Sequence, residues 1–263
     1  MPEIAAYLAI GAATGFFAGL LGIGGGTIIV SSLALMFAAQ GFPARYVMHM
    51  AIGTSLAAIM AGAWASFRTH DRHGSVDWSV VKPMIPGALV GVFAGAALAR
   101  VLGGGFLKVF FLSFMAVIIA QAVLDLKPKA ARGLPGTAGL AATAVFIGTS
   151  SSLFGGGAAA VGVPFFTWCG MTMHRAIGTV AALGFPVAIA GAVGYAIAGL
   201  DVPELPPWSA GFVYLPAFVG ISAASVLVAP YGARLAHRLK GPTLRRIFAV
   251  FLILIGVKVA ISV

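Results

Sequence analysis

Two apolar stretches of the chain are each interrupted by three consecutive glycines. The first reads GFFAGLLGIGGGTIIVSSL over residues 15–33, and the second reads FIGTSSSLFGGGAAAVGVPF over residues 146–165. Glycine costs a helix about 1 kcal/mol per residue relative to alanine, so a triplet is expected to break a helix. Inside a membrane, a broken helix is tolerated only where its freed backbone groups contact protein or a water-lined cavity. We therefore expect the two breaks to mark the functional centre.

The composition places these breaks in a membrane. Hydrophobic residues make up 60% of the 263 residues and charged residues only 8%, whereas soluble domains carry about 25% charged residues. The net charge of +10 is read as orientation charge rather than nucleic-acid binding, because the basic residues stand in short loops between apolar runs. The single cysteine, Cys169, excludes an internal disulfide and a thiolate metal cluster. We expect a multi-pass membrane protein with no metal ion, no cofactor and no nucleic-acid partner.

The apolar segments follow one order twice: a broken hairpin and then three spans. The first hairpin covers about 36 residues, or about 54 Å of helix, which is too long for one crossing and too short for two. A polar loop is expected at Arg68–Asp77. The sequence predicts an all-α polytopic fold of about eight full spans and ten helical segments. These segments are 4–21, 27–39, 47–67, 79–99, 106–125, 137–153, 158–169, 174–199, 209–229 and 243–262.

Matching sequence elements indicate an internal duplication. The glycine triplets are 131 residues apart, HMAIGT at 49–54 matches HRAIGT at 174–179, and GAALAR at 95–100 resembles GARLAH at 232–237. Three markers in the same order favour a repeat. We expect a first repeat over 1–126, a basic linker over 127–136 and a second repeat over 137–263, within one integral membrane domain.

The distribution of basic residues favours an inverted second repeat with both termini outside. The inverted arrangement puts twelve Lys and Arg residues inside and four outside, whereas a parallel one gives nine and seven. The twelve are Arg68, Arg72, Lys82, Lys127, Lys129, Arg132, Arg175, Arg234, Arg238, Lys240, Arg245 and Arg246.

Inverted repeats with broken helices are typical of secondary transporters with a site near the membrane midplane. The first N–H groups of a helix that begins after each break carry partial positive charge, and glycine lets an oxyanion approach them closely. An alternative is that the glycines only allow close packing and the hydroxyls bond to their own backbone. The candidate anion-binding residues are Gly24, Gly25, Gly26, Thr27, Thr54, Ser151, Ser152, Gly155, Gly156, Gly157 and Thr179.

Two histidines head the repeated H-x-A-I-G-T element. His49 and His174 could couple transport to protons or gate it, since histidine titrates near neutral pH, or each could cap the start of a membrane helix. No Asp or Glu is expected deep within a span. A carboxylate proton relay and an intramembrane cation site are therefore disfavoured.

Together these motifs resemble the TauE/SafE family of sulfite and organosulfur-anion exporters. The matching residues are Gly22–Gly26 with His49–Ser55, and Gly155–Gly157 with His174–Thr179. The family usually has a proline about five residues beyond the triplet, where this chain has Ser31 and Gly162. The resemblance implies alternating-access transport of sulfite, sulfonates or related oxyanions across a bacterial-type plasma membrane, with an ion gradient as the driving force.

Three alternatives stay open. An anion channel would use the same donors but needs a continuous pore. An intramembrane hydrolase would need Ser151 or Ser152 beside His174, and it is disfavoured because Leu20 stands at the position that matches Ser151. A homodimer is compatible with the sequence, which does not fix the oligomeric state.

Overall fold

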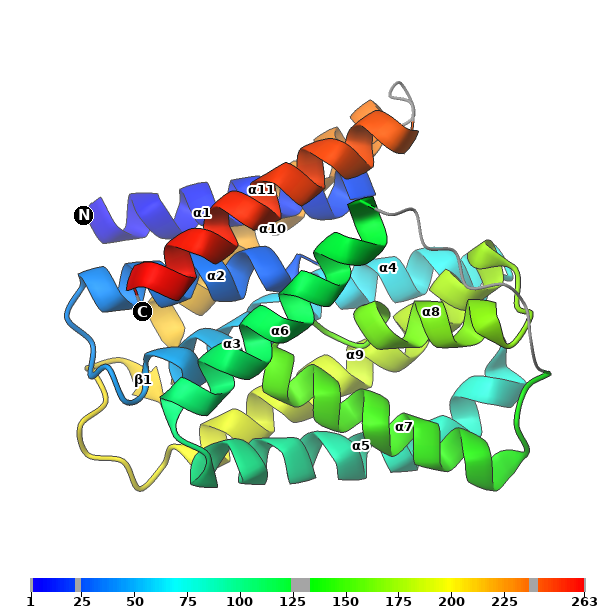
Figure 1. Cartoon of the computed structure of the whole chain (residues 1–263), viewed down its shortest axis with the longest axis horizontal. Helices are drawn as coiled ribbons and strands as arrows, with labels where there is room; N and C mark the ends of the chain where they lie inside the picture. The colour runs from blue at the N-terminus through cyan, green and yellow to red at the C-terminus, as the bar shows by residue number, and fades with distance from the viewer. Residues whose placement is uncertain (1, 22–24, 124–132, 237–240, 263) are drawn as a thin grey trace.

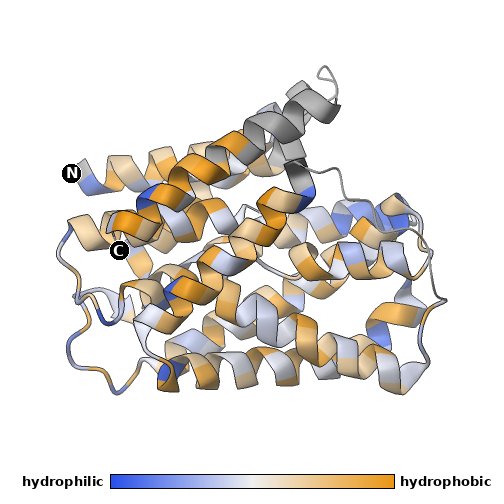
Figure 2. Ribbon diagram, viewed as in Figure 1, coloured by the Kyte–Doolittle hydropathy of each residue, from blue (hydrophilic) through white to orange (hydrophobic). Residues whose placement is uncertain are grey.

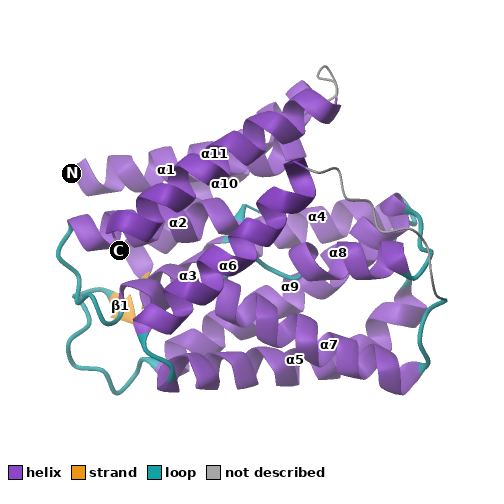
Figure 3. Ribbon diagram, viewed as in Figure 1, coloured by secondary structure: helices purple, strands orange, loops and turns teal. Residues whose placement is uncertain are grey.

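The fold is a bundle of α-helices with one short β-hairpin, as shown in Figure 1 and Figure 3. The computed structural model describes residues 2–21, 25–123, 133–236 and 241–262. The all-α class predicted from the sequence is confirmed. The elements are α1 (Pro2–Leu21), α2 (Gly26–Ala39), α3 (Val47–Ala58), α4 (Met60–Arg72), α5 (Trp78–Val101), α6 (Gly104–Val123), α7 (Thr137–Phe154), α8 (Ala159–Trp168), α9 (Met173–Ala198), β1 (Ser209–Ala210), β2 (Val213–Tyr214), α10 (Leu215–Ala236) and α11 (Gly241–Ser262).

Several helices are long and apolar enough to cross a membrane. Within the described ranges there are five such helices, one of which is Val47–Arg72, formed by α3 and α4 together, and there are five shorter apolar helices. Hydrophobic residues, in orange, are spread along the helices, and hydrophilic residues, in blue, gather toward the two ends of the bundle (Figure 2). Large apolar residues such as Val219 and Leu227 are exposed on the bundle surface, as expected for a surface in contact with lipid. The protein is a multi-pass membrane protein.

Each glycine triplet separates two helices. At the first, Gly25 precedes α2, while residues 22–24 lie outside the described part of the chain. At the second, Gly155 and Gly157 have φ values of +71° and +78°. Residues with a side chain rarely adopt this left-handed conformation, so glycine lets the backbone turn from α7 into α8.

The third span differs from its prediction. Residues 47–67 were expected to form one helix, and α3 and α4 together do form one span, Val47–Arg72, with a turn residue at Ile59. The difference is at the end, where α4 continues through Arg72 into the expected polar loop. The extension occurs because the first break signal after Arg68 is Gly74, whose φ is +65°. Thr69 Oγ1 also donates to Ala65 O at 2.9 Å within the extended helix.

The helix predicted over residues 209–229 begins later in the structure. Residues 209–214 were assigned to a helix, but they form a hairpin that pairs Ser209 with Tyr214 and Ala210 with Val213. Gly211 turns this hairpin with a φ of +55°, and a Cβ there would lie 1.8 Å from Ala196 O. Helix α10 then starts at Leu215, with Pro216 in its first turn, where a missing N–H costs nothing.

The most extensive helix packing joins the two halves of the chain. Helix α1 packs along α10, and α7 packs along α5. The first predicted segment of each half therefore lies against the fourth of the five predicted segments of the other half. Glycines allow these close approaches: a Cβ on Gly15 would lie 2.3 Å from Ser225 O, and a Cβ on Gly91 would lie 2.1 Å from Val145 O. Both interfaces therefore depend on backbone-to-backbone contact.

Matched helices run in opposite directions in Figure 1. Both termini lie at one end of the bundle; α6 runs away from that end, whereas α11 runs toward it. An inverted repeat would place α6 and α11 in this way, and the inverted arrangement itself stays a prediction. The orientation of the repeats relative to a membrane stays a prediction, as do the boundaries of the basic linker, most of which lies outside the described residues.

Candidate functional site

The two glycine breaks, which are far apart in the sequence, contact each other at the centre of the bundle. A Cβ placed on Gly26 would lie 2.6 Å from Gly155 O and 2.7 Å from the Cα atom of Gly156. No side chain fits at Gly26 without moving backbone. The triplets are therefore needed for this contact as well as for ending helices.

Ser55 on α3 joins the two breaks. Its fully buried hydroxyl lies 3.2 Å from Gly26 O and 3.0 Å from Gly155 O, so its single proton is shared between these two carbonyls. Sequence reasoning included Ser55 only as the end of the first family motif. Its position directly after HMAIGT was the available signal, but the distance to Gly155 depends on how the halves pack.

A cavity of about 460 Å³ opens beside the two breaks. Its wall includes Gly25 from the first break and Gly156 and Gly157 from the second, and it extends along α4 to Thr69 and His70. The other polar residues in the wall are Thr14, Ser66 and Ser225, and most of the remaining wall is apolar. Among the described residues, the wall contains no Lys, Arg, Asp or Glu.

Both helices that leave the breaks begin without a side-chain cap. The residues before α2 and α8 are Gly25 and Ala158, and neither offers a hydrogen bond from its side chain. Ile28 and Ile29 donate their N–H groups to Gly25 O, so the N–H groups of Gly26 and Thr27 precede the first intrahelical bonds. Helix starts of this kind attract negative charge. The fold thus places two uncapped helix starts together at one end of a cavity.

Thr14 is a residue of the cavity wall that sequence reasoning missed. It lies on α1 against the first break, because a Cβ on Gly25 would be 2.3 Å from Thr14 Cγ2. Thr14 is 2% exposed, and its hydroxyl has no hydrogen-bond partner. Other threonines within helices, such as Thr69 and Thr143, donate to the carbonyl four residues earlier. A buried hydroxyl without a partner at the cavity wall is therefore a group that a ligand could satisfy.

The serines before the second break are buried but lie outside the cavity wall. Ser151 and Ser152 are 1% and 0% exposed, and neither hydroxyl has a partner. The Ser152 side chain lies against Gly95 of α5, and its carbonyl accepts a hydrogen bond from Tyr195 Oη at 2.9 Å. Thr27 is also buried and outside the wall.

The predicted threonines of the repeated motif join the two halves. Thr54 Oγ1 accepts a hydrogen bond from the N–H of Tyr214, and Thr179 Oγ1 accepts one from the N–H of Asp77. Thr54 therefore binds the segment that leads into α10 of the second half, and Thr179 binds the segment that leads into α5 of the first half. The neighbouring Gly178 shows the same close approach, since a Cβ there would lie 2.6 Å from Ser75 O.

The two predicted histidines occupy different environments, and neither lines the cavity. His49 is 3% exposed, and its Nε2 atom lies 2.8 Å from Ala99 O and 3.2 Å from Leu102 O, at the end of α5. His174 is exposed at the start of α9. The histidine in the wall is His70.

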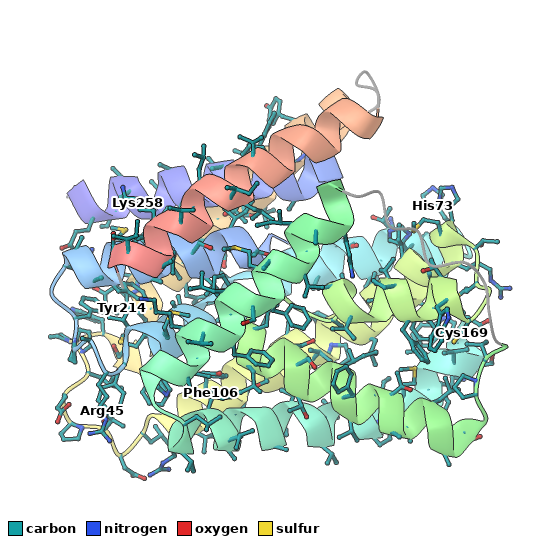
Figure 4. The ribbon with its side chains drawn as sticks, in the orientation of Figure 1. Arg45, His73, Phe106, Cys169, Tyr214 and Lys258 are labelled. Carbon is teal, nitrogen blue, oxygen red and sulfur yellow. The ribbon has the colours of Figure 1, made fainter. Side chains whose placement is uncertain are left out.

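The cavity extends toward one end of the bundle, and buried aromatic rings lie toward the other end. Figure 4 shows His73 and Cys169 at one end, and Arg45 and Tyr214 at the other. The cavity reaches the end with His73, near which His70 lies in sequence. Toward the other end Phe212 is 1% exposed, with ring centroids 5.0 Å from His49 and 5.6 Å from Tyr46.

These features occur in a chain whose sequence matches a known transporter family over almost its whole length. The model of the family described as "Sulfite exporter TauE/SafE" matches residues 7–259. The chain belongs to the TauE/SafE family. This confirms the resemblance drawn from the glycine triplets and the H-x-A-I-G-T elements.

TauE/SafE relatives with curated names are described as transporters. A protein of Haemophilus influenzae, named "Probable membrane transporter protein", is 32% identical over 95% of this chain and 95% of its own length. YdhB of Bacillus subtilis, "Probable membrane transporter protein YdhB", is 25% identical over 70% of this chain and 76% of its own length. No solved structure matches the chain at a significant level. Membrane transport is thus the general function that these relatives support.

The hydrolase alternative gains no support from the geometry. Within the described residues, no hydrogen bond joins Ser151 or Ser152 to His174, and His174 is exposed while both serines are buried. The relatives are named as membrane transporters.

Proposed function

We propose that the protein is a secondary transporter of small sulfur-containing anions, such as sulfite or sulfonates, that works by alternating access. The observation that carries this proposal is the meeting of two uncapped helix starts at one end of a cavity. Gly26 of the first break contacts Gly155 and Gly156 of the second, and Gly25, Gly156 and Gly157 face the cavity. The anion binds there to backbone N–H groups and to the Thr14 hydroxyl.

The chemistry of the wall suits a singly charged anion. Helix starts supply partial charges, each contributing roughly 0.3–2 kcal/mol toward a bound anion. The described wall contains no Lys or Arg to balance a second negative charge. Apolar residues such as Ile29, Ile59 and Val180 form the nearby wall, and they suit the hydrocarbon part of a sulfonate. In this conformation Ser151, Ser152, Thr54 and Thr179 are not assigned to the anion.

Alternating access is supported by the position of the cavity, whose wall includes the exposed residues Ser66 and Thr69 toward one end of the bundle. The cavity extends toward His70, while Phe212, His49 and Tyr195 fill the opposite end with buried rings. The excess of basic residues predicted inside includes Arg68 and Arg72, at the open end. We therefore infer that this conformation faces the cytoplasm.

The matching spans α3–α4 of the first half and α9 of the second half differ in continuity and in burial. The span α3–α4 is interrupted at Ile59, and α4 has no buried residue. The matching span α9, 125 residues later, is continuous, and its second half buries Val187, Gly191 and Tyr195. Position 59 matches Gly184, which is followed by Pro186. We infer that the opposite-facing state forms when α9 bends at Gly184–Pro186.

The distinction between a transporter and a channel rests on the extent of the cavity. A channel needs a continuous pore, whereas the cavity described here ends at the glycine breaks. The test is counterflow in proteoliposomes loaded with unlabelled methanesulfonate. A transporter accumulates labelled methanesulfonate transiently above equilibrium, whereas flux without such accumulation would overturn alternating access. Failure of sulfite and sulfonates to elicit any flux would overturn the substrate class.

A further inference from the structure

His70 is the ionisable side chain in the cavity wall, within the part of the chain that the structure describes. It lies in the last turn of α4 and is partly exposed. The other polar wall groups are hydroxyls and backbone atoms, which do not change charge near neutral pH. The charge of the wall therefore depends on whether this imidazole carries a second proton.

The charged groups around His70 leave its imidazole without a carboxylate partner among the described residues. His73 at the end of α4 and His174 on α9 act on it electrostatically. The nearby carboxylates bind elsewhere, since Asp71 accepts from Trp78 Nε1 at 2.9 Å and Asp77 pairs with Arg175 at 3.1 Å.

The remaining cations at this end of α4 do not enter the wall. The guanidinium of Arg68 lies 5.2 Å from the centre of the Trp64 ring. Arg72 is exposed and is not part of the wall. An anion in the cavity is thus the group available to balance the charge of a protonated His70.

We propose that His70 is the residue that binds a proton together with the transported anion. An anion and an imidazolium in the same cavity form a neutral pair, so proton binding at His70 strengthens anion binding, and anion binding strengthens proton binding. The coupling role predicted for His49 and His174 is thereby assigned to a different histidine. This inference rests on the anion-transport function proposed above.

The test measures anion affinity at two pH values with a probe that does not itself titrate. Methanesulfonate stays ionised throughout, which sulfite does not. Calorimetry on the purified full-length protein should give a Kd about tenfold lower at about pH 5.5 than at about pH 8, because protonation of His70 adds a positive charge to the cavity wall. His70→Gln should bind weakly at both pH values, and His70→Lys should bind tightly at both.

Two neighbouring histidines provide matched controls. His73→Gln and His174→Gln remove imidazoles from the same end of the bundle but not from the wall, and both should still bind the anion more tightly at the lower pH. Wild-type pH dependence in His70→Gln would overturn the assignment. So would loss of pH dependence in His174→Gln with His70 intact.

Nitrate, which also stays ionised, separates this inference from the proposed function. A wild-type protein that binds nitrate but not methanesulfonate would overturn the sulfur-anion substrate, while the nitrate affinities would still decide the role of His70. If the wild-type protein binds an anion with the same affinity at both pH values, the role of His70 alone is overturned. Binding of neither anion would overturn both proposals.

Discussion

The hydroxyl of Thr54 accepts a hydrogen bond from the backbone N–H of Tyr214 at 2.9 Å. The matching Thr179, 125 residues later, does the same for Asp77 at 3.1 Å. Each threonine thus binds the backbone just before the fourth span of the other half. The repeated H-x-A-I-G-T element is explained by contact between the halves.

This relationship predicts the effect of removing either hydroxyl. Thr54→Val should lower the free energy of unfolding by roughly 1–3 kcal/mol, because the buried N–H of Tyr214 loses its partner. Thr179→Val should cost less, since the bond to Asp77 is only partly buried. Thermal unfolding measures both, with Thr143→Val as the control because Thr143 donates within its own helix. Unchanged stability with weakened anion binding would instead return Thr54 to the anion site.

Thr14 should behave in the opposite way. Thr14→Val removes a buried hydroxyl that has no protein partner, so the ligand-free protein should be as stable as the wild type or more stable. Anion affinity should fall by roughly 10- to 100-fold, as expected for a lost hydrogen bond to a charged group. Calorimetry should show that Thr14→Ser retains most of the affinity. A destabilised Thr14→Val with normal affinity would contradict this role.

Gly26→Ala tests the contact between the two breaks. A Cβ at this position would meet Gly155 O at 2.6 Å, so the backbone must shift at a cost of about 1–3 kcal/mol in stability. The matched control is Gly62→Ala on α4, where a Cβ has nothing within 4 Å. Equal stability of the two variants in chemical denaturation would mean that the breaks do not touch.

Gly184→Ala tests the proposed bending of α9. A Cβ there also has nothing within 4 Å, so this conformation should tolerate it. Alanine favours a continuous helix by about 1 kcal/mol, which lowers the population of the bent state about fivefold. Counterflow should slow by up to this factor, and Gly62→Ala, which likewise adds a methyl group to the cavity wall, serves again as the control. An unchanged rate would place the hinge elsewhere.

The direction of the opening can be measured with single cysteines. Cys169 is the one cysteine of the chain. It is 8% exposed, and because no other cysteine is present, Cys169→Ala gives a background without thiols. In that background Ser66→Cys, in the cavity wall, should react with a membrane-impermeant maleimide only from the cytoplasmic side. Leu200→Cys, in the exposed loop at the other end, should react only from outside, and the reverse pattern would invert the assigned topology.

The local features of the fold were predictable, whereas the contacts between halves were not. Helix breaks at Gly25–Gly26 and Gly155–Gly157 follow from the conformational preference of glycine, which acts at each position alone. The contact of Gly26 with Gly155 depends on the packing of the halves, which no single stretch of sequence encodes. Residues 209–214 were misassigned because an apolar hairpin and the start of an apolar span have similar composition.

The candidate site was found in part. Thr14 carries a sequence signal, since it is the one Ser or Thr residue within the apolar segment 4–21, but glycine and histidine patterns drew the interpretation elsewhere. His70 was placed in a polar loop because the helix was expected to end at residue 67. The extension of α4 to Arg72 brings His70 into the cavity wall.

The pairing of α1 with α10 has a consequence for biosynthesis. The glycine surface of α1 fits the backbone of α10, where a Cβ on Gly11 would lie 2.6 Å from Ile221 O. The ribosome makes that partner about 210 residues after Gly11. Until then α1 has only lipid and the helices made before α10 as neighbours, and its glycine surface stays unmatched. The native bundle therefore forms after the nascent chain is almost complete, which makes late truncations far more harmful than their length suggests.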